Sequence, residues 1–171
     1  NEFSRGINSI PSSDANYTDN YKHIRRTNLL LQNAEAYAKP EDIKQYIGEA
    51  YFFRAYSYFD LLQLYGDVII TKKPLDITDP EMKVKRNDRS EVVDLIIDDL
   101  NHAVENLPAF KELTTEEEGR ISKEGAQAFL SRVALYEGTW QKSRNGNQNT
   151  QRSANLLDIA AKAARTVIDA K

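Results

Sequence analysis

The segment from Pro40 to Gly66 constrains the fold more than any other part of this 171-residue chain. Its apolar residues recur at the spacing of a helix, so that Ile47 and Leu61 fall on one stripe. Proline at the first position and glycine after the last are typical of the two ends of a helix. The pattern predicts a helix over residues 40–65, about 39 Å long at ~1.5 Å per residue.

This predicted helix is also rich in aromatic residues. Its rings belong to Tyr46, Tyr51, Phe52, Phe53, Tyr56, Tyr58, Phe59 and Tyr65. A helix with apolar side chains on so much of its surface is stable in water only when other elements cover it. We therefore expect neighbouring helices on both of its sides and most of these rings in the core.

A first helix is predicted before the aromatic segment. Thr18 or Asp19 can cap its start by accepting hydrogen bonds from backbone amides. Apolar residues then follow at spacings of three and four, and we expect the helix to end near Tyr37. Residues 1–16 have no sustained period and contain glycine, proline and serine, which indicates an irregular lead-in segment. The remaining chain, residues 17–171, is expected to form one helical domain.

After the aromatic segment, residues 67–86 are the one stretch that could be extended, because they begin with a short β-branched run. Pro74 and Pro80 break whatever follows, so we expect a long loop that crosses the surface. Asp88 with Glu91 three positions later has the pattern of a capping box, which predicts the start of a third helix. That helix is expected to end at the Leu-Pro pair at 107–108.

Two more helices are predicted in the last third of the chain. Ser122 is expected to cap the fourth, which should end between Gly138 and Trp140, with Trp140 packing against the helix end. A polar loop over 142–150 then precedes the fifth. The expected buried faces are Ala126, Phe129, Leu130, Val133 and Leu135 on the fourth helix, and Ala154, Leu157, Ala160, Ala161, Ala164 and Ile168 on the fifth.

These elements predict an all-α fold of tetratricopeptide-like stacked antiparallel helix pairs, with about five main helices. Ala50 and Phe53 recur 76 positions later as Ala126 and Phe129, which favours a repeat that spans a whole helix pair. Five helices make two pairs and leave the last one over. Because a repeat buries one face only through its neighbour, we interpret the chain as an incomplete portion of a larger α-rich fold.

Composition excludes several classes of function. The chain has no cysteine, which excludes disulfides, thiolate catalysis and zinc bound by sulfur. Its two histidines lie far apart in sequence, so no histidine-rich metal site is expected, and no cofactor is predicted. A formal charge of −3 argues against a nucleic-acid partner. No apolar run approaches the ~20 residues that span a bilayer. The chain begins at Asn1 without an initiator methionine, and we interpret it as a processed or excised piece.

Two polar residues interrupt the predicted apolar stripes, Asn28 on the first helix and Arg54 on the second. Both could contact a ligand, but an unpaired buried guanidinium costs several kcal/mol. We therefore expect structural roles, with hydrogen bonds to backbone carbonyls or to a carboxylate such as Glu49. On this interpretation methionine should replace Arg54 better than alanine does.

Candidate catalytic residues are scarce. Asp94, Asp98 and Asp99 lie close together, but the first two share a helix face where like charges repel, and we expect all three on a solvated outer face. The chain has no glycine-rich phosphate loop, no nucleophile elbow and no metal-ligand spacing. The sequence therefore predicts a protein that is not an enzyme.

The chain resembles the SusD/RagB family in four blocks that occur in the same order. The strongest is GEAYFFRAYSYFDLLQLYGDVII at 48–70, an aromatic helix followed by Leu-Tyr-Gly-Asp. Before it, Ile24-Arg25-x-x-Asn28 is similar to the first helix of that family. After it come Ile97-x-Asp99-Leu100-x-x-Ala103 with Leu107-Pro108, and Gly119-Arg120-x-Ser122-Lys123-x-x-Ala126 with Leu130-x-Arg132-x-x-Leu135-Tyr136.

This resemblance implies a function and a location. Members of the family are surface-exposed outer-membrane lipoproteins of Bacteroidetes that bind glycans or other nutrients and act as a lid on a SusC-like TonB-dependent transporter. They are not catalytic. The lipidated cysteine of the family has no counterpart here, so the resemblance places the anchor upstream of this chain. The family's sugar-contacting residues come largely from regions outside it, which leaves Phe3, Arg5 and Asn8 in the lead-in as candidate glycan contacts.

The alternative is an intracellular tetratricopeptide-like scaffold that holds a peptide in its concave groove. Such a groove needs polar and basic residues on the inner helix faces, where this chain has Tyr, Phe and Leu. A hydrolase remains a third interpretation, which no residue pattern favours.

Overall fold

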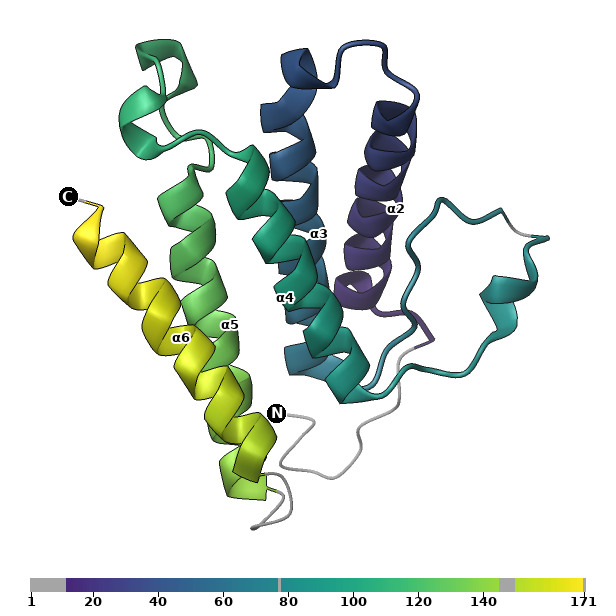
Figure 1. Cartoon of the computed structure of the whole chain (residues 1–171). Coiled ribbons are helices and arrows are strands. Elements are labelled where there is room, and N and C mark those ends of the chain that lie inside the picture. Colours follow the sequence, from purple (N-terminus) through teal and green to yellow (C-terminus); the bar gives the residue numbers. More distant parts are fainter. Residues whose placement is uncertain (1–11, 77, 145–149, 171) are drawn as a thin grey trace, which may run out of the picture.

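The computed structural model describes residues 12–76, 78–144 and 150–170. Most of this part of the chain lies in the helices α2 (Ala15–Glu35), α3 (Lys44–Tyr65), α4 (Arg89–Asn106), α5 (Lys123–Arg144) and α6 (Thr150–Asp169) (Figure 1). Short 3₁₀ turns occur at Pro40–Ile43, Pro80–Lys83, Phe110–Glu112 and Thr115–Glu117. The only β-type pairing in the described residues is one antiparallel bridge between Val68 and Asn87. The all-α prediction is confirmed.

The helices lie side by side in chain order, and each packs on the next (Figure 1). Helix α3 lies between α2 and α4, as expected for a helix covered on both sides. The expectation that the last helix is left without a partner is wrong, because α6 packs extensively against α5. Gly138 permits this close approach, since a Cβ there would lie 3.0 Å from the side chain of Leu157. The Ser153 hydroxyl also donates a 2.8 Å hydrogen bond to the Gly138 carbonyl.

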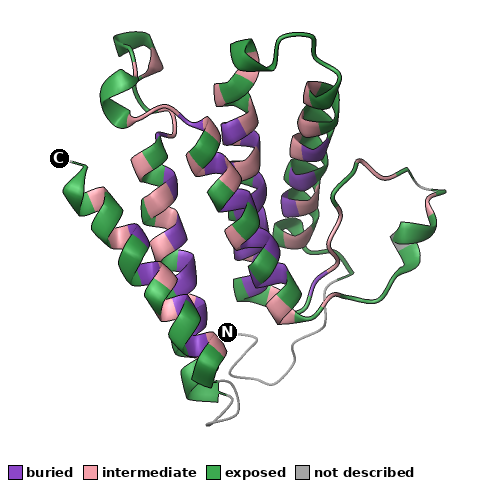
Figure 2. Ribbon diagram, viewed as in Figure 1, coloured by how far each residue is buried: buried purple, intermediate pink, exposed green. Residues whose placement is uncertain are grey.

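The core runs along the inner faces of α3, α4 and α5 (Figure 2). Its fully buried side chains include Tyr58, Leu61 and Leu62 of α3 and Ile96 and Leu100 of α4. The expectation that the rings of α3 are mostly buried is wrong for three of them. Tyr46, Phe53 and Tyr56 are 49%, 48% and 53% exposed, because α2 and α4 leave one face of α3 open.

Two of the predicted helix starts differ from those observed. α2 begins at Ala15 because Asp14 caps it and accepts a 2.9 Å hydrogen bond from the Asn16 amide, one turn before Thr18 and Asp19. Residues 40–43 form a 3₁₀ turn, so α3 begins at Lys44. The capping box of Asp88 and Glu91 is present at the start of α4, as predicted.

The C-terminal end of α3 agrees with the prediction, whereas the end of α5 and the buried face of α6 differ from it. Gly66 follows α3 with a φ of 74°, a left-handed backbone that glycine adopts without strain. α5 continues to Arg144, past its predicted end, because Gly138 is helical and serves helix packing. The buried face of α6 is rotated from the prediction and consists of Ser153, Leu156, Ala160 and Ala163. Ala154, Ala161, Ile168 and, on α5, Leu135 are exposed.

Candidate functional site

The segment 68–73, which follows α3, is extended and is held by side chains from the helices. The Tyr21 hydroxyl donates to the Ile69 carbonyl at 2.7 Å. The Tyr58 hydroxyl accepts from the Thr71 amide at 2.8 Å and donates to the Thr71 carbonyl at 3.2 Å. The side chain of Asn87 accepts from the amide of residue 70 at 2.9 Å. The segment is irregular, as expected of a loop, but Val68 is fully buried and helix side chains bind the backbone that follows it.

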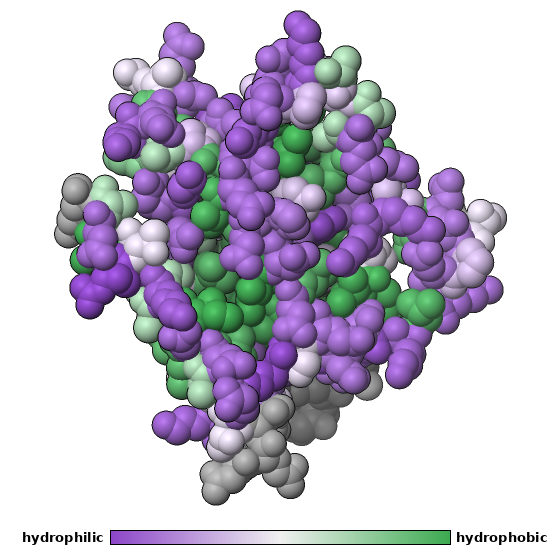
Figure 3. All heavy atoms as spheres, viewed as in Figure 1, coloured by the Kyte–Doolittle hydropathy of each residue, from purple (hydrophilic) through white to green (hydrophobic). Residues whose placement is uncertain are grey.

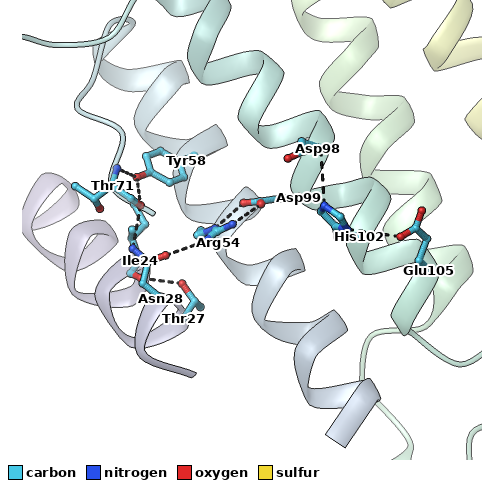
Figure 4. Close-up of polar contacts among 10 residues, drawn as sticks. All are labelled: Ile24, Thr27, Asn28, Arg54, Tyr58, Thr71, Asp98, Asp99, His102 and Glu105. Carbon is cyan, nitrogen blue, oxygen red and sulfur yellow. Dashed lines mark hydrogen bonds and ion pairs between the residues drawn. The ribbon is translucent and has the colours of Figure 1, made fainter. Parts of the chain in front are cut away.

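A buried polar network lies behind this segment (Figure 4). Arg54 donates through Nε and Nη2 to the two carboxylate oxygens of Asp99, at 2.8 and 2.6 Å. Its Nη1 donates to Oδ1 of Asn28 at 2.8 Å, and the Asn28 amide in turn donates to the carbonyls of Thr71 at 2.9 Å and Lys73 at 3.3 Å. The network therefore links α4, α3 and α2 to the extended segment.

The structure corrects the expected partner of Arg54. Glu49 instead forms a bidentate pair with Arg120 of the loop before α5, at 2.7 and 2.8 Å. Asp99 also does not lie on the solvated outer face, since it is fully buried, whereas Asp94 and Asp98 are exposed as expected. Successive helical residues point about 100° apart, so Asp99 faces the core directly next to exposed Asp98.

The charge of Arg54 is maintained in this buried position. Burial by itself disfavours the charged guanidinium, but the hydrogen bonds and the negative charge of Asp99 outweigh it and raise the pKa of Arg54 above its ordinary value. All three guanidinium nitrogens have partners in the network, so the side chain has a structural role.

A groove of about 560 Å³ lies between the first half of α2 and the segment after α3. We call it the α2 groove and define it by Tyr17, Tyr21, Arg25, Thr71, Lys73 and Leu75. The loop of residues 67–86, which supplies one wall of the groove, protrudes beside α2 in Figure 1. Figure 3 shows hydrophobic residues beside the base of that loop, and a second hydrophobic area on the same face between α4 and α6. The groove thus combines ring surfaces with charged and hydroxyl groups, an arrangement that can bind a ligand with both apolar and polar parts.

The start of α2 is tied to the end of α3 beside this groove. Tyr65 Oη donates to Asp14 Oδ2 at 2.6 Å, and the ring of Tyr17 packs edge-on against that of Tyr65 at 5.3 Å. The hydrogen bond from Tyr65 lowers the pKa of Asp14, and the adjacent carboxylate raises the pKa of Tyr65 to about 12.

Replacing Tyr65 by phenylalanine is expected to raise the pKa of the Asp14 carboxyl toward its ordinary value, because the hydroxyl that stabilises the carboxylate is lost. A lowered native pKa contributes stability above the unfolded-state pKa, and this stability is lost as the pH falls through the native value. The variant should therefore lose stability less steeply on acidification. Carboxyl carbon NMR titration measures this pKa, and an unchanged value would contradict the interpretation. Tyr37→Phe, at an exposed tyrosine elsewhere, is the control.

The sequence-based glycan candidates Phe3, Arg5 and Asn8 lie outside the described residues. The ring of His102 stacks on the ring of Tyr51, with 4.8 Å between the ring centroids. Among the residues that the structure describes, no three or more His, Cys, Asp or Glu side chains gather in a way that could hold a metal ion. No helix in that same part of the chain is long and apolar enough to cross a bilayer.

Successive helices that pack side by side, with a groove beside the long loop after α3, define an all-α scaffold of stacked helices. A SusD-like family model, described as "Starch-binding associating with outer membrane", matches residues 6–135. The chain belongs to the SusD-like family, and the resemblance found in the sequence is confirmed.

Individual relatives agree with this assignment. A SusD-like protein of Formosa agariphila is 33% identical over 133 residues, which cover 75% of this chain and 25% of the relative. The crystal structure of a SusD-like protein from Bacteroides fragilis aligns with a TM-score of 0.79 and 27% identity over 99% of this chain and 30% of its own. A laminarin-binding SusD-like protein aligns with a TM-score of 0.71 and 29% identity over 93% of this chain and 32% of its own. The chain spans about a quarter of the length of the curated relatives it matches.

Sequence reasoning missed the α2 groove. Tyr21 and Arg25 were assigned only to a helix and to a family motif, and Thr71 and Lys73 only to a loop. The β-branched run at 68–70 indicated that this stretch could be extended, but it did not indicate which helix the stretch would pack against.

Proposed function

We propose that this protein binds glycans, or another nutrient, at the bacterial cell surface without catalysis and delivers them to a SusC-like TonB-dependent transporter. The observation that carries the proposal is the match of residues 6–135 to the SusD-like family model, whose description names starch binding and the outer membrane. The proposal includes a location in the outer membrane, with a lipid anchor at a cysteine upstream of this chain.

Two solved relatives support a carbohydrate as the ligand. One is described as laminarin-binding. Another, 26% identical with a TM-score of 0.69, was solved with a xylogluco-oligosaccharide. Helices that pack as tightly as α3 between α2 and α4 can hold loops in fixed positions, which lowers the ordering cost of binding. Phe3, Arg5 and Asn8 remain proposed glycan contacts.

Affinity electrophoresis of the full-length protein tests the glycan part of this proposal. We expect its migration to slow in native gels that contain one of a panel of polysaccharides, because bound protein moves with the polymer. Migration unchanged by every polysaccharide in the panel would contradict glycan binding. A protein of similar mass with no carbohydrate affinity is the control for the electrophoresis. A separate assay tests for hydrolase activity: the full-length protein should release no colour from chromogenic glycosides.

Location and partner need a separate measurement. Protease added to intact cells should degrade the protein, whereas an intracellular tetratricopeptide-like scaffold would be protected. The protein purified from detergent-solubilised outer membranes should carry a TonB-dependent transporter with it. Protection from protease, or purification without a transporter, would contradict that part of the proposal.

A further inference from the structure

We propose that the α2 groove is a binding subsite for a neutral oligosaccharide. This inference rests on the proposed function, since it states where on the protein the glycan binds and that the glycan is uncharged. The groove is built from the N-terminal half of α2 and from the segment that follows α3, and its volume of about 560 Å³ lies within the range of small-ligand sites, ~300–1,000 Å³.

The composition of the groove matches the two kinds of surface on a sugar ring. A pyranose has an apolar C–H face and a rim of hydroxyl groups. Tyr17, Tyr21 and Leu75 supply apolar lining, and Thr71, Lys73 and Arg25 supply groups that hydrogen-bond to hydroxyls. A wholly apolar ligand would leave these charged groups without water or a partner, which disfavours it.

The charges of the groove favour a neutral ligand. Lys73 pairs with Glu81 at 2.7 Å, and Lys22 pairs with Asp19 at 2.8 Å, so two of the three cations that line the groove already have a counter-charge. The carboxylates of Asp76 and Glu81 also line it. A polyanion would meet these carboxylates, whereas hydroxyl groups can donate to carboxylates and accept from cations equally well.

One wall of the groove is fixed before any ligand arrives. The carbonyls of Thr71 and Lys73 accept hydrogen bonds from Asn28, which Arg54 holds in place. Tyr58 binds the backbone of Thr71 through both its amide and its carbonyl. This wall therefore needs little ordering on binding, which favours affinity.

The test is isothermal titration calorimetry of the full-length protein with neutral oligosaccharides, including laminarin and xyloglucan fragments, and with uronic-acid oligosaccharides of matched length. The groove variant is Arg25→Ala with Lys73→Ala. Its matched control is Arg26→Ala with Lys72→Ala, which removes the same charges from adjacent exposed residues that do not line the groove. Because the truncated side chains are exposed, both variants should remain folded, and thermal unfolding checks this.

We expect the groove variant to weaken binding of a neutral oligosaccharide by about tenfold, and the control by less than about twofold, since each lost hydrogen bond contributes modestly. Equal effects of the two variants, or none from the groove variant, would overturn the assignment of the groove while leaving glycan binding intact. Tighter binding of the uronic-acid series would overturn the neutral class. A wild-type protein that binds no oligosaccharide would contradict the proposed function and the groove together.

Discussion

Replacing Arg54 by methionine is expected to lower the free energy of unfolding by about 3–5 kcal/mol. The substitution leaves the Asp99 carboxylate fully buried without its counter-charge, and it leaves Oδ1 of Asn28 without a donor. Arg54→Ala should cost at least as much, because it also removes the packed stem. The sequence-based expectation that methionine would replace Arg54 better than alanine treated the charge of Arg54 as merely satisfied, whereas the buried carboxylate of Asp99 depends on that charge.

A double variant separates the charge from the packing. Arg54→Met with Asp99→Leu removes both charges, so much of the lost stability should return, less the cost of the unpaired Asn28. Urea unfolding of the full-length protein measures these differences, with Arg26→Met as the control at an exposed arginine. A double variant no more stable than Arg54→Met would show that the buried charge of Asp99 is not the cause.

Replacing Arg89 by methionine is expected to have a similar effect, about 3–5 kcal/mol, at the contact between α4 and α5. Glu137 is fully buried, and Arg89 donates to its Oε2 through Nε at 2.9 Å. The guanidinium also lies 4.1 Å from the centre of the Trp140 ring, which explains how this tryptophan packs. Methionine retains part of the ring contact. Among the described residues, it leaves the Gln141 amide, 2.7 Å away, as the remaining hydrogen-bond donor to the carboxylate of Glu137.

The companion variant for this pair is Glu137→Gln in the Arg89→Met background. An uncharged amide is much less costly to bury than a carboxylate, so the second substitution should restore stability. Urea unfolding again provides the measurement, with Arg144→Met at the exposed end of α5 as the control. A loss below about 1 kcal/mol for Arg89→Met would mean that water or another group compensates Glu137.

The helices were predictable from the sequence because their signals are local. The capping box at Asp88 and Glu91 and the glycine at Gly66 act within a few residues of the helix ends that they set. The start of α2 was misplaced because Asp14, Thr18 and Asp19 are all acceptable caps, and the choice depends on Tyr65, which reaches Asp14 from the far end of α3.

The partners of the buried charges were not predictable, because they depend on which helix faces meet. The sequence offers both Glu49, on the same helix as Arg54, and Asp99, on the next helix, as carboxylate partners. Only the packing of α3 on α4 places Asp99 against Arg54. The prediction of which face of α6 is buried was wrong for a related reason, since the alanines of this helix form more than one apolar stripe. Packing on α5 buries the stripe that contains Leu156, while Leu157 of the predicted stripe is half-buried and lies against Gly138 of α5.

The α2 groove also depends on tertiary structure. Its two walls come from residues 17–25 and 69–81, which are separated in the chain by the whole of α3. No motif connects Arg25 with Lys73, and only the hydrogen bonds from Tyr21, Asn28 and Tyr58 bring the extended segment against α2.

A crystal structure of the full-length protein with a bound neutral oligosaccharide tests most directly whether α3 is a supporting helix for a binding surface formed by other elements. The prediction is a sugar in contact with Tyr17, Arg25 and Lys73, with the Arg54–Asp99 pair unchanged from the free protein. A sugar seated against the exposed rings of α3, or found cleaved in a hollow lined by them, would contradict it.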